Sequence, residues 1–221
     1  MADPLLSVDL EIRLGDLVVQ PRFTAEAERV ILFGPSGAGK SVTLRTIAGL
    51  VRPSAGHVRL GGRILDDHAQ GIHQPPQERR VGYVPQQYAL FPHLTVRENI
   101  AYGLHRLPRE ARRVRVEELL DRMRLGDRAD RRPHELSGGQ QQRAALARAL
   151  APSPEMLLMD EPFAALEESL RVELREEVRR LQSQDRIPVL LVTHNLEEAY
   201  SLADRLVVFL GGRVVQVGPR E

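Results

Sequence analysis

The sequence contains no cysteine, which excludes disulfide bonds and thiolate metal sites. No apolar run approaches the roughly 20 residues that cross a bilayer, and residues 1–14 lack the basic segment and apolar core of a signal peptide. The formal net charge of +1 gives no reason to expect nucleic acid as a partner. We therefore expect a soluble cytoplasmic protein, and a length of 221 residues favours a single domain, 1–221.

Lysine is nearly absent as well. Of the 31 lysine and arginine residues, only Lys40 is a lysine. A chain that uses arginine at every other basic position indicates a site at Lys40 where a compact ammonium group is needed and a planar guanidinium does not fit.

Lys40 stands in a glycine-rich segment between an apolar run at 30–33 and a helical pattern at 42–50. In this setting the pattern G-x-x-x-x-G-K-[ST] is typical of a P-loop, whose backbone amides surround phosphate oxygens at a helix N-terminus. Lys40 would reach the β- and γ-phosphates, and the Ser41 hydroxyl would bind Mg²⁺. The alternative is an ordinary glycine-rich turn. The candidate binding residues are Gly34, Pro35, Ser36, Gly37, Ala38, Gly39, Lys40, Ser41 and Val42.

Polar residues follow three further runs that are predicted as buried strands: Gln86, the pair Asp160-Glu161, and His194. Because ligands in open α/β sheets lie beyond the carboxyl ends of the strands, we expect these side chains near the P-loop. An apolar run ending in Asp is the Walker B pattern, so Asp160 would hold Mg²⁺, and Glu161 would orient and deprotonate a water molecule. The alternatives are a turn boundary at 160–162 and an ordinary hydrogen-bonded histidine at 194.

A second candidate phosphate site begins a later helical pattern. It consists of Ser137, Gly138, Gly139 and Gln140, which combine a hydroxyl, glycine amides and a helix N-terminus. The alternative is a helix cap and nothing more. One nucleotide does not need two such sites on one chain, so this site would serve a second molecule.

The order of the patterns predicts an α/β fold. Apolar runs alternate with helical periodicity, which favours a mainly parallel sheet, and residues 8–14 and 17–23 predict an N-terminal antiparallel strand pair. Residues 66–80 have no periodicity and are predicted as a loop. Further strands are expected at 30–33, 57–60, 81–84, 156–159, 189–193, 206–210 and 214–217, and helices at 42–50, 96–104, 109–124, 139–150, 166–181 and 196–202.

The part from about residue 88 to 153 is predicted as a helical subdomain. It is rich in arginine, most densely between Arg106 and Arg124. Such a density marks either an acidic partner or, more simply, a solvated helix face.

Taken together, the motifs resemble those of the nucleotide-binding subunit of an ABC transporter. Five of them occur in that family's order: 34–41, Gln86, 136–140, 160–161 and His194. The resemblance implies a P-loop NTPase with ATP and Mg²⁺ as cofactors. It also implies an ATP-dependent homodimer in which each ATP lies between one subunit's P-loop and the LSGGQ segment of the other. By the same resemblance Gln86 contributes to the metal site and senses the γ-phosphate, His194 contacts the γ-phosphate, and both join Glu161 as candidate catalytic residues.

The sequence next to these motifs is similar to that of importer subunits. Residues 87–96 resemble the segment near the docking groove for membrane-spanning permease subunits, and 61–76 is similar to molybdate-type importers, with sulfate, polyamine and iron importers close behind. We expect Tyr88, Leu90, Phe91 and Leu94 to line that groove, unless they only anchor the helical subdomain.

The resemblance implies a chain that is peripheral on the inner face of the cell membrane. It would power import of an oxyanion such as molybdate, would be served indirectly by a periplasmic binding protein, and would lack the C-terminal regulatory domain of some relatives. The alternatives are a soluble ABC ATPase, which would need a coiled-coil insertion or a second cassette, and an exporter module.

Two positions depart from the family pattern. Glu167 stands where an aspartate usually follows the Ala-Leu pair of the D-loop. The aromatic residue that usually stacks on adenine is missing from the first strand, which leaves Arg13 or Phe23 as candidate substitutes.

Overall fold

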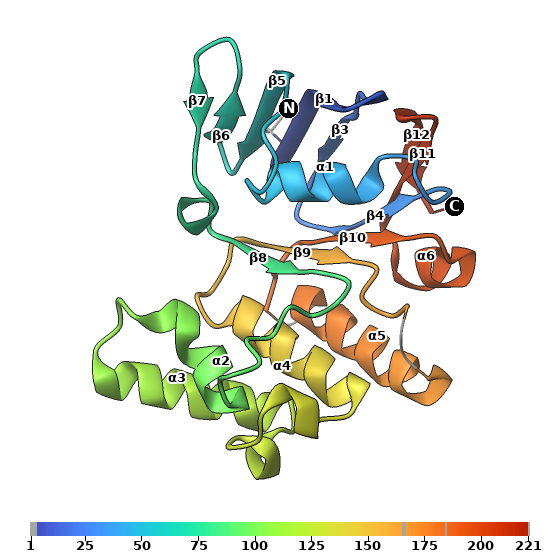
Figure 1. The fold of residues 1–221 in the computed structure, drawn as a ribbon. Helices are drawn as coiled ribbons and strands as arrows, with labels where there is room; N and C mark the ends of the chain where they lie inside the picture. The colour runs from blue at the N-terminus through green and yellow to red at the C-terminus, as the bar shows by residue number, and fades with distance from the viewer. Residues whose placement is uncertain (1–3, 165–166, 184, 221) are drawn as a thin grey trace.

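The computed structural model describes residues 4–164, 167–183 and 185–220. Its strands form two sheets, with helix α1 (Lys40–Ile47) between them and the longer helices on the far side of the second sheet (Figure 1). The structure is therefore layered, with α1 covered by a sheet on either side.

The first sheet is antiparallel throughout. Its order is β2-β1-β5-β6-β7, and β3 pairs with the first half of β1. Alternate residues of β1 are buried, as expected for a strand with one face on a core. The strands are β1 (Leu6–Leu14), β2 (Leu17–Val19), β3 (Arg22–Ala25), β5 (Ala55–Leu60), β6 (Arg63–Asp67) and β7 (Ile72–His73).

The second sheet is the core sheet, with the order β12-β11-β4-β10-β9-β8. Only the edge strand β12 is antiparallel to its neighbour. All residues of β9 and β10 are buried, which explains why these strands are continuous apolar runs. The strands are β4 (Arg29–Phe33), β8 (Val81–Val84), β9 (Met156–Asp160), β10 (Val189–Thr193), β11 (Arg205–Leu210) and β12 (Arg213–Pro219).

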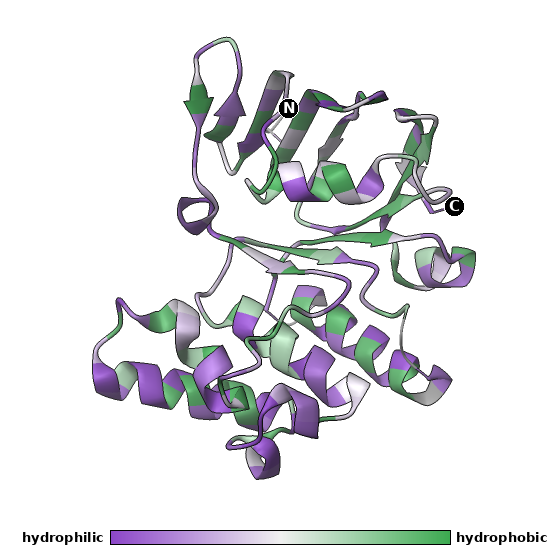
Figure 2. Ribbon diagram, viewed as in Figure 1, coloured by the Kyte–Doolittle hydropathy of each residue, from purple (hydrophilic) through white to green (hydrophobic). Residues whose placement is uncertain are grey.

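The two faces of the core sheet bury different clusters. In β4, Val30 and Leu32 pack toward α1 and the antiparallel sheet, while Ile31 packs toward the helices on the other side. Those helices turn their hydrophobic stretches to the core and their hydrophilic ones to solvent (Figure 2). They are α2 (Val96–Ala101), α3 (Arg109–Arg122), α4 (Gly138–Leu150) and α5 (Glu168–Ser183), and the short α6 (Leu196–Leu202) follows β10.

Two expectations about local structure were wrong. Residues 17–23 do not form one strand, because the chain breaks at Gln20 and Pro21 into β2 and β3, which pair with different halves of β1. The segment 66–80 is not all loop: β6 extends to Asp67, β7 pairs with it, and the 3₁₀ turn η1 (Pro76–Glu78) follows. Strands this short show no periodicity in the sequence. The predicted start of a helix at Leu166 lies outside the described residues.

Candidate functional site

The P-loop connects β4 to α1, and its backbone requires glycine at two positions. A Cβ atom on Gly34 would lie 2.3 Å from the backbone oxygen of Phe209 in β11, and one on Gly39 would lie 2.4 Å from the side chain of Val19. Both residues also have positive φ, at +152° and +98°. Close packing and backbone conformation therefore both exclude a side chain at these positions.

Four backbone amides of the P-loop have no partner in the described part of the chain. The amide N–H groups of Gly37, Gly39, Lys40 and Ser41 donate no hydrogen bond within the described part of the chain, because they lie at the start of α1 or just before it. Unpaired amides at a helix N-terminus form an anion site. The predicted phosphate-binding segment therefore has the donors that a phosphate group needs.

The Lys40 side chain folds back over this loop. Its Nζ donates to the backbone oxygens of Gly34 and Pro35, at 2.8 Å each, and the side chain is almost completely buried. Burial lowers the pKa of Lys40, and the nearby charges of Glu161 and Asp160 oppose that shift. The ammonium group is thus held at the mouth of the loop by two neutral carbonyls.

Ser41 and Asp160 are in direct contact. The Ser41 hydroxyl donates to Oδ1 of Asp160 over 2.6 Å, which joins the first residues of α1 to the end of β9. Asp160 is buried, and burial raises its pKa. The side chain of Tyr83, which sequence reasoning missed, lies near it: burial, the charge of Asp160 and a hydrogen bond to it raise the pKa of Tyr83 to about 12. Its only sequence signal is its position near the end of β8.

The donor set fits Mg²⁺. Ser41 and Asp160 offer a hydroxyl and a carboxylate oxygen, the hard oxygen ligands that Mg²⁺ prefers. The described ranges contain no cluster of three or more His, Cys, Asp or Glu side chains placed to hold a metal ion. A magnesium ion here would rely on these two side chains and on phosphate oxygens of a nucleotide, as is usual for Mg²⁺.

Gln86, Glu161 and His194 converge at the carboxyl ends of three adjacent strands, β8, β9 and β10. Gln86 Nε2 donates to one carboxylate oxygen of Glu161 over 3.3 Å, and His194 Nδ1 lies 3.1 Å from the other. A carboxylate only accepts, so Nδ1 of His194 is the donor. The three side chains are therefore in contact, as expected from their positions after neighbouring strands.

Glu161 is held in an unusual conformation for its residue type. Its φ is +45°, and its amide donates to the backbone oxygen of Val192 in β10. A positive φ is costly for a residue with a side chain, and such positions concentrate at functional sites. This conformation turns the carboxylate toward Gln86 and His194 instead of continuing the strand.

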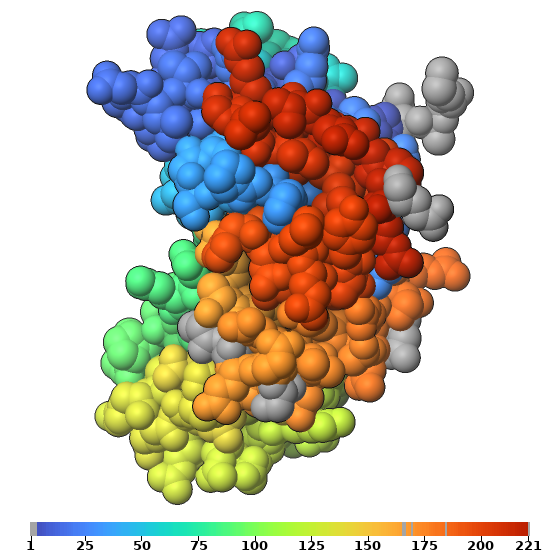
Figure 3. Space-filling view, turned by 90° about the vertical axis from the view of Figure 1, so that its right-hand side faces the viewer, coloured from blue at the N-terminus to red at the C-terminus, as the bar shows by residue number. Residues whose placement is uncertain are grey.

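The segment Ser137–Gln140 starts α4 and does not touch the P-loop. Ser137 Oγ accepts from the amide of Gln140, and Gln140 Oε1 accepts from the amide of Ser137, which forms a capping box. Ser137 and Gly138 are exposed, and a Cβ on Gly139 would press on Leu170 at 3.0 Å. On the face seen in Figure 3, α1 (light blue) lies in the upper half and the start of α4 (yellow) in the lower half.

Burial corrects two minor expectations. Tyr88 is not available to line a docking groove, because it is buried in the core beneath the helices. Phe23 cannot stack on a nucleobase, since it is buried and pairs with Val8 at the start of β1. Arg13 remains exposed, but its guanidinium pairs with Glu11 at 2.8 Å. In the D-loop, the position that differs from the family pattern, Glu167, is exposed. The preceding Leu166 lies outside the described residues.

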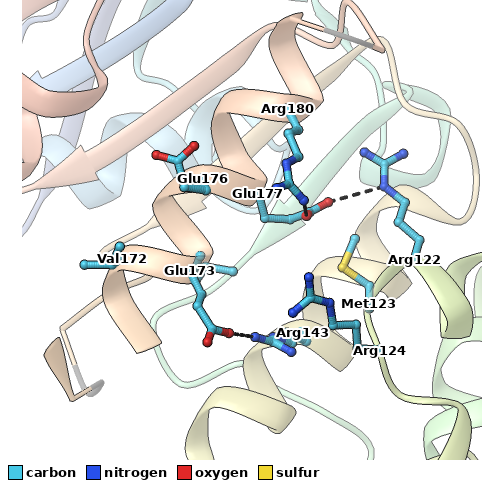
Figure 4. Close-up of a pocket in the computed structure, with 10 residues that line it drawn as sticks. Arg122, Met123, Arg124, Arg143, Val172, Glu173, Glu176, Glu177 and Arg180 are labelled. Carbon is cyan, nitrogen blue, oxygen red and sulfur yellow. Dashed lines mark hydrogen bonds and ion pairs between the residues drawn. The ribbon is translucent and has the colours of Figure 1, made fainter. Parts of the chain in front are cut away.

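A cavity of about 210 Å³ lies away from all these residues, between α3, α4 and α5 (Figure 4). Its charges largely neutralise one another: Arg122 and Arg180 pair with Glu177, and Arg143 pairs with Glu173. It contains no residue of the phosphate or carboxylate clusters. We therefore place the candidate site at the P-loop and not in this cavity.

The comparisons with known proteins identify the family. Residues 23–164, more than half of the chain, match the family described as ABC transporter. The chain belongs to the ABC transporter family. As a member of it the chain is an ATP-hydrolysing domain, and the resemblance inferred from its motifs is confirmed.

Several curated import proteins are similar over nearly the whole chain. The molybdate/tungstate import ATP-binding protein WtpC of Archaeoglobus fulgidus is 46% identical over 96% of this chain and 86% of its own length. ModC of Mesorhizobium japonicum, a molybdenum import protein, is 42% identical, and CysA of Thermosynechococcus vestitus, a sulfate/thiosulfate import protein, is 47% identical. The chain spans 58% of the length of each of these two.

Two solved structures confirm the predicted P-loop NTPase fold. The ATP-binding cassette MJ0796, solved as a dimer in a post-hydrolysis state with ADP and Pi, has a TM-score of 0.83 at 31% identity, covering 98% of this chain and 99% of its own. CbiO1 from Clostridium perfringens, part of the transporter complex cbiONQ, has a TM-score of 0.85 at 26% identity, covering 99% and 90%. None of the helices in the described residues combines the length and apolar character needed to cross a bilayer.

Proposed function

We propose that this domain hydrolyses ATP to power an ABC importer, and that the reaction is carried out at the carboxyl ends of four core strands. The observation that carries the proposal is the convergence there of Ser41 with Asp160 and of Gln86 and His194 on Glu161. These groups come from α1 and from the ends of β8, β9 and β10, beside the P-loop that follows β4. The arrangement combines phosphate donors, Mg²⁺ ligands and a positioned carboxylate.

Nucleotide binding would use donors that are free in the protein. The unpaired amides of Gly37, Gly39, Lys40 and Ser41 would donate to phosphate oxygens. The ammonium of Lys40 would exchange its two carbonyl contacts for the β- and γ-phosphates. Ser41 and Asp160 would hold Mg²⁺, which neutralises charge on the phosphates when bound.

Glu161 would act on the attacking water. Its two oxygens face Gln86 and His194, so a water molecule placed between these side chains and the γ-phosphate can donate a proton to the carboxylate. General-base assistance of this kind is worth about 10²–10⁴ in rate. His194 and Gln86 would orient the carboxylate and contact the γ-phosphate, which couples the presence of ATP to strand β8 and the segment after it.

The exposed start of α4 would bind the ATP of a second copy. Ser137 and Gly138 are exposed, and the start of α4 lies on the same face of the molecule as α1 (Figure 3). Head-to-tail pairing of two copies would bring each P-loop against the other copy's helix start. The dimeric form of the neighbour MJ0796 supports this arrangement.

The permease would dock beside the segment that follows Gln86. Phe91 stacks on the exposed Tyr102, with ring centroids 4.3 Å apart, and the guanidinium of Arg148 lies over the Phe91 ring. This gives a partly apolar surface near the γ-phosphate side of the sheet. Crosslinking of Tyr102→Cys to a co-expressed permease, with Val172→Cys on exposed α5 as control, tests it. Crosslinking only at position 172 would contradict the proposed surface.

The transported substrate is proposed as molybdate or a similar oxyanion, supplied by a periplasmic binding protein, with this chain peripheral on the cytoplasmic face. The names of the relatives WtpC, ModC and CysA support an oxyanion, although a spermidine/putrescine import protein is 44% identical as well. Uptake of molybdate, sulfate and spermidine by the chain reconstituted with its permease distinguishes these substrates.

The proposed reaction is tested by phosphate release. The purified chain with Mg²⁺ and ATP should release phosphate, and Glu161→Gln should reduce the rate by about 10²-fold or more. Glu110→Gln is the matched control, because Glu110 pairs with Arg113 on the exposed face of α3. Equal rates in wild type and Glu161→Gln would contradict the role given to this carboxylate.

A further inference from the structure

Arg79 is completely buried, which is unusual for an arginine and is not explained by the site described above. It lies just after η1 and two residues before β8, the strand that Gln86 follows. Its side chain extends to the C-terminal end of α1, whose other end is the P-loop. The residue thus joins three parts of the structure that meet around the nucleotide site.

The guanidinium caps the last turn of α1. Nη1 donates to the backbone oxygens of Thr46 and Ile47, both at 3.0 Å, and Nε donates to the backbone oxygen of Gln74 at 2.8 Å. The last carbonyls of a helix have no partner within the helix and carry partial negative charge. A buried cation that donates to two of them fixes the position of that end.

The turn after α1 is shaped around this guanidinium. Leu50 donates to Arg45 and Gly49 donates to Thr46, the two backbone bonds of a Schellman motif, and Gly49 has a φ of +82°. A Cβ on Gly49 would lie 2.4 Å from Nε of Arg79. Glycine at 49 therefore serves both the helix end and the space that the arginine occupies.

The charge of Arg79 is balanced by the β6–β7 hairpin. Its Nη2 lies 2.7 Å from Oδ2 of the buried Asp66, and Nδ1 of His73 donates to the other oxygen, Oδ1, at 2.5 Å. Burial lowers the pKa of Arg79 and the charge of Asp66 opposes that shift. Arg79 and Asp66 therefore form a buried ion pair, and the hydrogen bond from His73 holds the carboxylate in place.

The backbone at Arg79 is also tied to β9. Arg63 donates to the backbone oxygen of Arg79 and pairs with Glu155, and the amide of Glu155 donates to the oxygen of Arg80. Glu155 directly precedes β9, the strand that ends at Asp160. The position of α1 is therefore set relative to both strands that carry Gln86 and Asp160.

We infer that Arg79 is a positioning residue for ATP binding and hydrolysis, which orients the P-loop helix relative to the strands that carry the metal ligand and the γ-phosphate sensor. Helix α1 has only eight residues, about 12 Å, so a small displacement of its C-terminal end moves the amides of the P-loop by a similar amount. The inference rests on the proposed function, because it needs the P-loop to be the nucleotide site. Misplacement by about 1 Å at a distance from the chemistry can cost on the order of 10²-fold in rate.

Two variants separate positioning from stability. Arg79→Leu alone would leave Asp66 as an unpaired buried charge, which is strongly destabilising. Arg79→Lys keeps a cation for Asp66 but has only one nitrogen for the two helix carbonyls and Asp66. The double variant Arg79→Leu/Asp66→Leu removes both charges.

We expect Arg79→Lys and the double variant to unfold cooperatively on heating. Their affinity for a fluorescent ATP analogue should fall between about 5-fold and 150-fold, the range of coupling between linked sites, and their kcat should be lower.

The matched control is Arg115→Leu. Arg115 donates to the backbone oxygens of Leu150 and Ala151 at the end of α4, so it makes the same kind of contact on a helix that is not part of the P-loop. We expect its nucleotide affinity to equal that of wild type. Wild-type affinity in a folded Arg79→Lys or double variant would overturn the inference, whereas failure of wild type to bind ATP would overturn the proposed function instead.

A measurement on the unmodified chain covers the case in which both variants unfold. If Arg79 links η1 to the P-loop helix, Mg-ATP should slow amide hydrogen exchange in residues 72–79 as well as in α1, by reciprocal coupling. The exposed helix segment 109–115 serves as the reference and should not change. Protection of α1 without protection of 72–79 would overturn the inference.

Discussion

Lys40 shows at the level of one residue why charge alone does not define a phosphate site. Its ammonium lies between two carbonyls of its own loop, Gly34 and Pro35, in a buried position. A guanidinium is wider and planar, so it cannot occupy the same space between phosphate oxygens. The sequence already pointed to this position, because the chain has no other lysine.

We therefore expect Lys40→Arg to abolish productive ATP binding although the charge is kept. A nucleotide titration measures this directly. Arg52→Lys, the reverse exchange on an exposed turn, should leave both binding and turnover at the wild-type level. Near-normal affinity in Lys40→Arg would mean that the single lysine is an accident of composition.

Asp160 illustrates a conflict between stability and function. Burial raises its pKa, so the ionised form costs free energy in the nucleotide-free protein. Asp160→Asn keeps the shape and the acceptor for Ser41 but removes that charge. We expect a melting temperature higher by about 2–4 °C without nucleotide, as about 1 kcal/mol gives in a domain of this size, and loss of the extra stabilisation by Mg-ATP.

The control for Asp160→Asn is Asp204→Asn, which should change the melting temperature in the opposite direction. Burial raises the pKa of Asp204, but hydrogen bonds from Arg29 outweigh burial and lower it. Its charge is therefore favourable in the folded state, and its removal should lower the melting temperature. A fall in melting temperature for both variants would contradict this, because it would show that the charge of Asp160 stabilises the folded protein.

The same residues show what a sequence can predict about a site. Gln86, Glu161 and His194 were expected to meet because parallel strands deliver their carboxyl ends to one edge of the sheet. Which face of a short segment is buried is set by packing partners far away in the chain. For this reason Tyr88 and Phe23 were assigned to surfaces although both are in a core, and the link from Arg79 to α1 was not foreseen.

At the level of elements, two helices begin with the same device. Thr95 and Glu98 form a capping box at the start of α2, as Ser137 and Gln140 do at the start of α4. Ser137 was predicted as part of a phosphate site or as a cap alone, and the structure leaves both roles open, because the serine caps its helix and is exposed.

The two capping boxes form a matched pair for an experiment. Thr95→Ala and Ser137→Ala should each lower stability by about 1 kcal/mol, through loss of one cap hydrogen bond, measured by denaturant unfolding. Only Ser137→Ala should also weaken ATP-dependent association of the chain, measured by light scattering. Equal ATP-dependent association of both variants would show that Ser137 acts only as a helix cap.

Elements that depend on long-range partners were the least predictable. Core strands β9 and β10 are buried on both faces and appear as apolar runs, so their positions were predicted almost to the residue. The hairpin β6–β7 and the turn η1 were missed, since β7 has only two residues and its register depends on Asp66, His73 and Arg79. A polar buried network leaves no hydrophobic period to detect.

For the whole molecule, the separation of the two candidate phosphate sites predicts that ATP links two copies. If ATP is bound both by one P-loop and by the Ser137 helix start of the other copy, hydrolysis releases the dimer. Glu161→Gln keeps the size and the hydrogen-bonding reach of the side chain but removes its charge and basicity, and Ser41 and Asp160 would still hold Mg²⁺. We expect this variant to bind ATP, fail to cleave it, and remain dimeric where wild type is mostly monomeric.

Size-exclusion chromatography with light scattering, with and without Mg-ATP, measures this. Adding Ser137→Arg to Glu161→Gln should abolish the dimer while ATP still binds at the P-loop, because the new side chain fills the second site but leaves the first untouched. Adding Val172→Arg on exposed α5 is the control for a new charge and should leave the dimer intact. A Glu161→Gln chain that stayed monomeric while saturated with nucleotide would rule out the shared ATP, since the trapped state is the one in which association must be strongest.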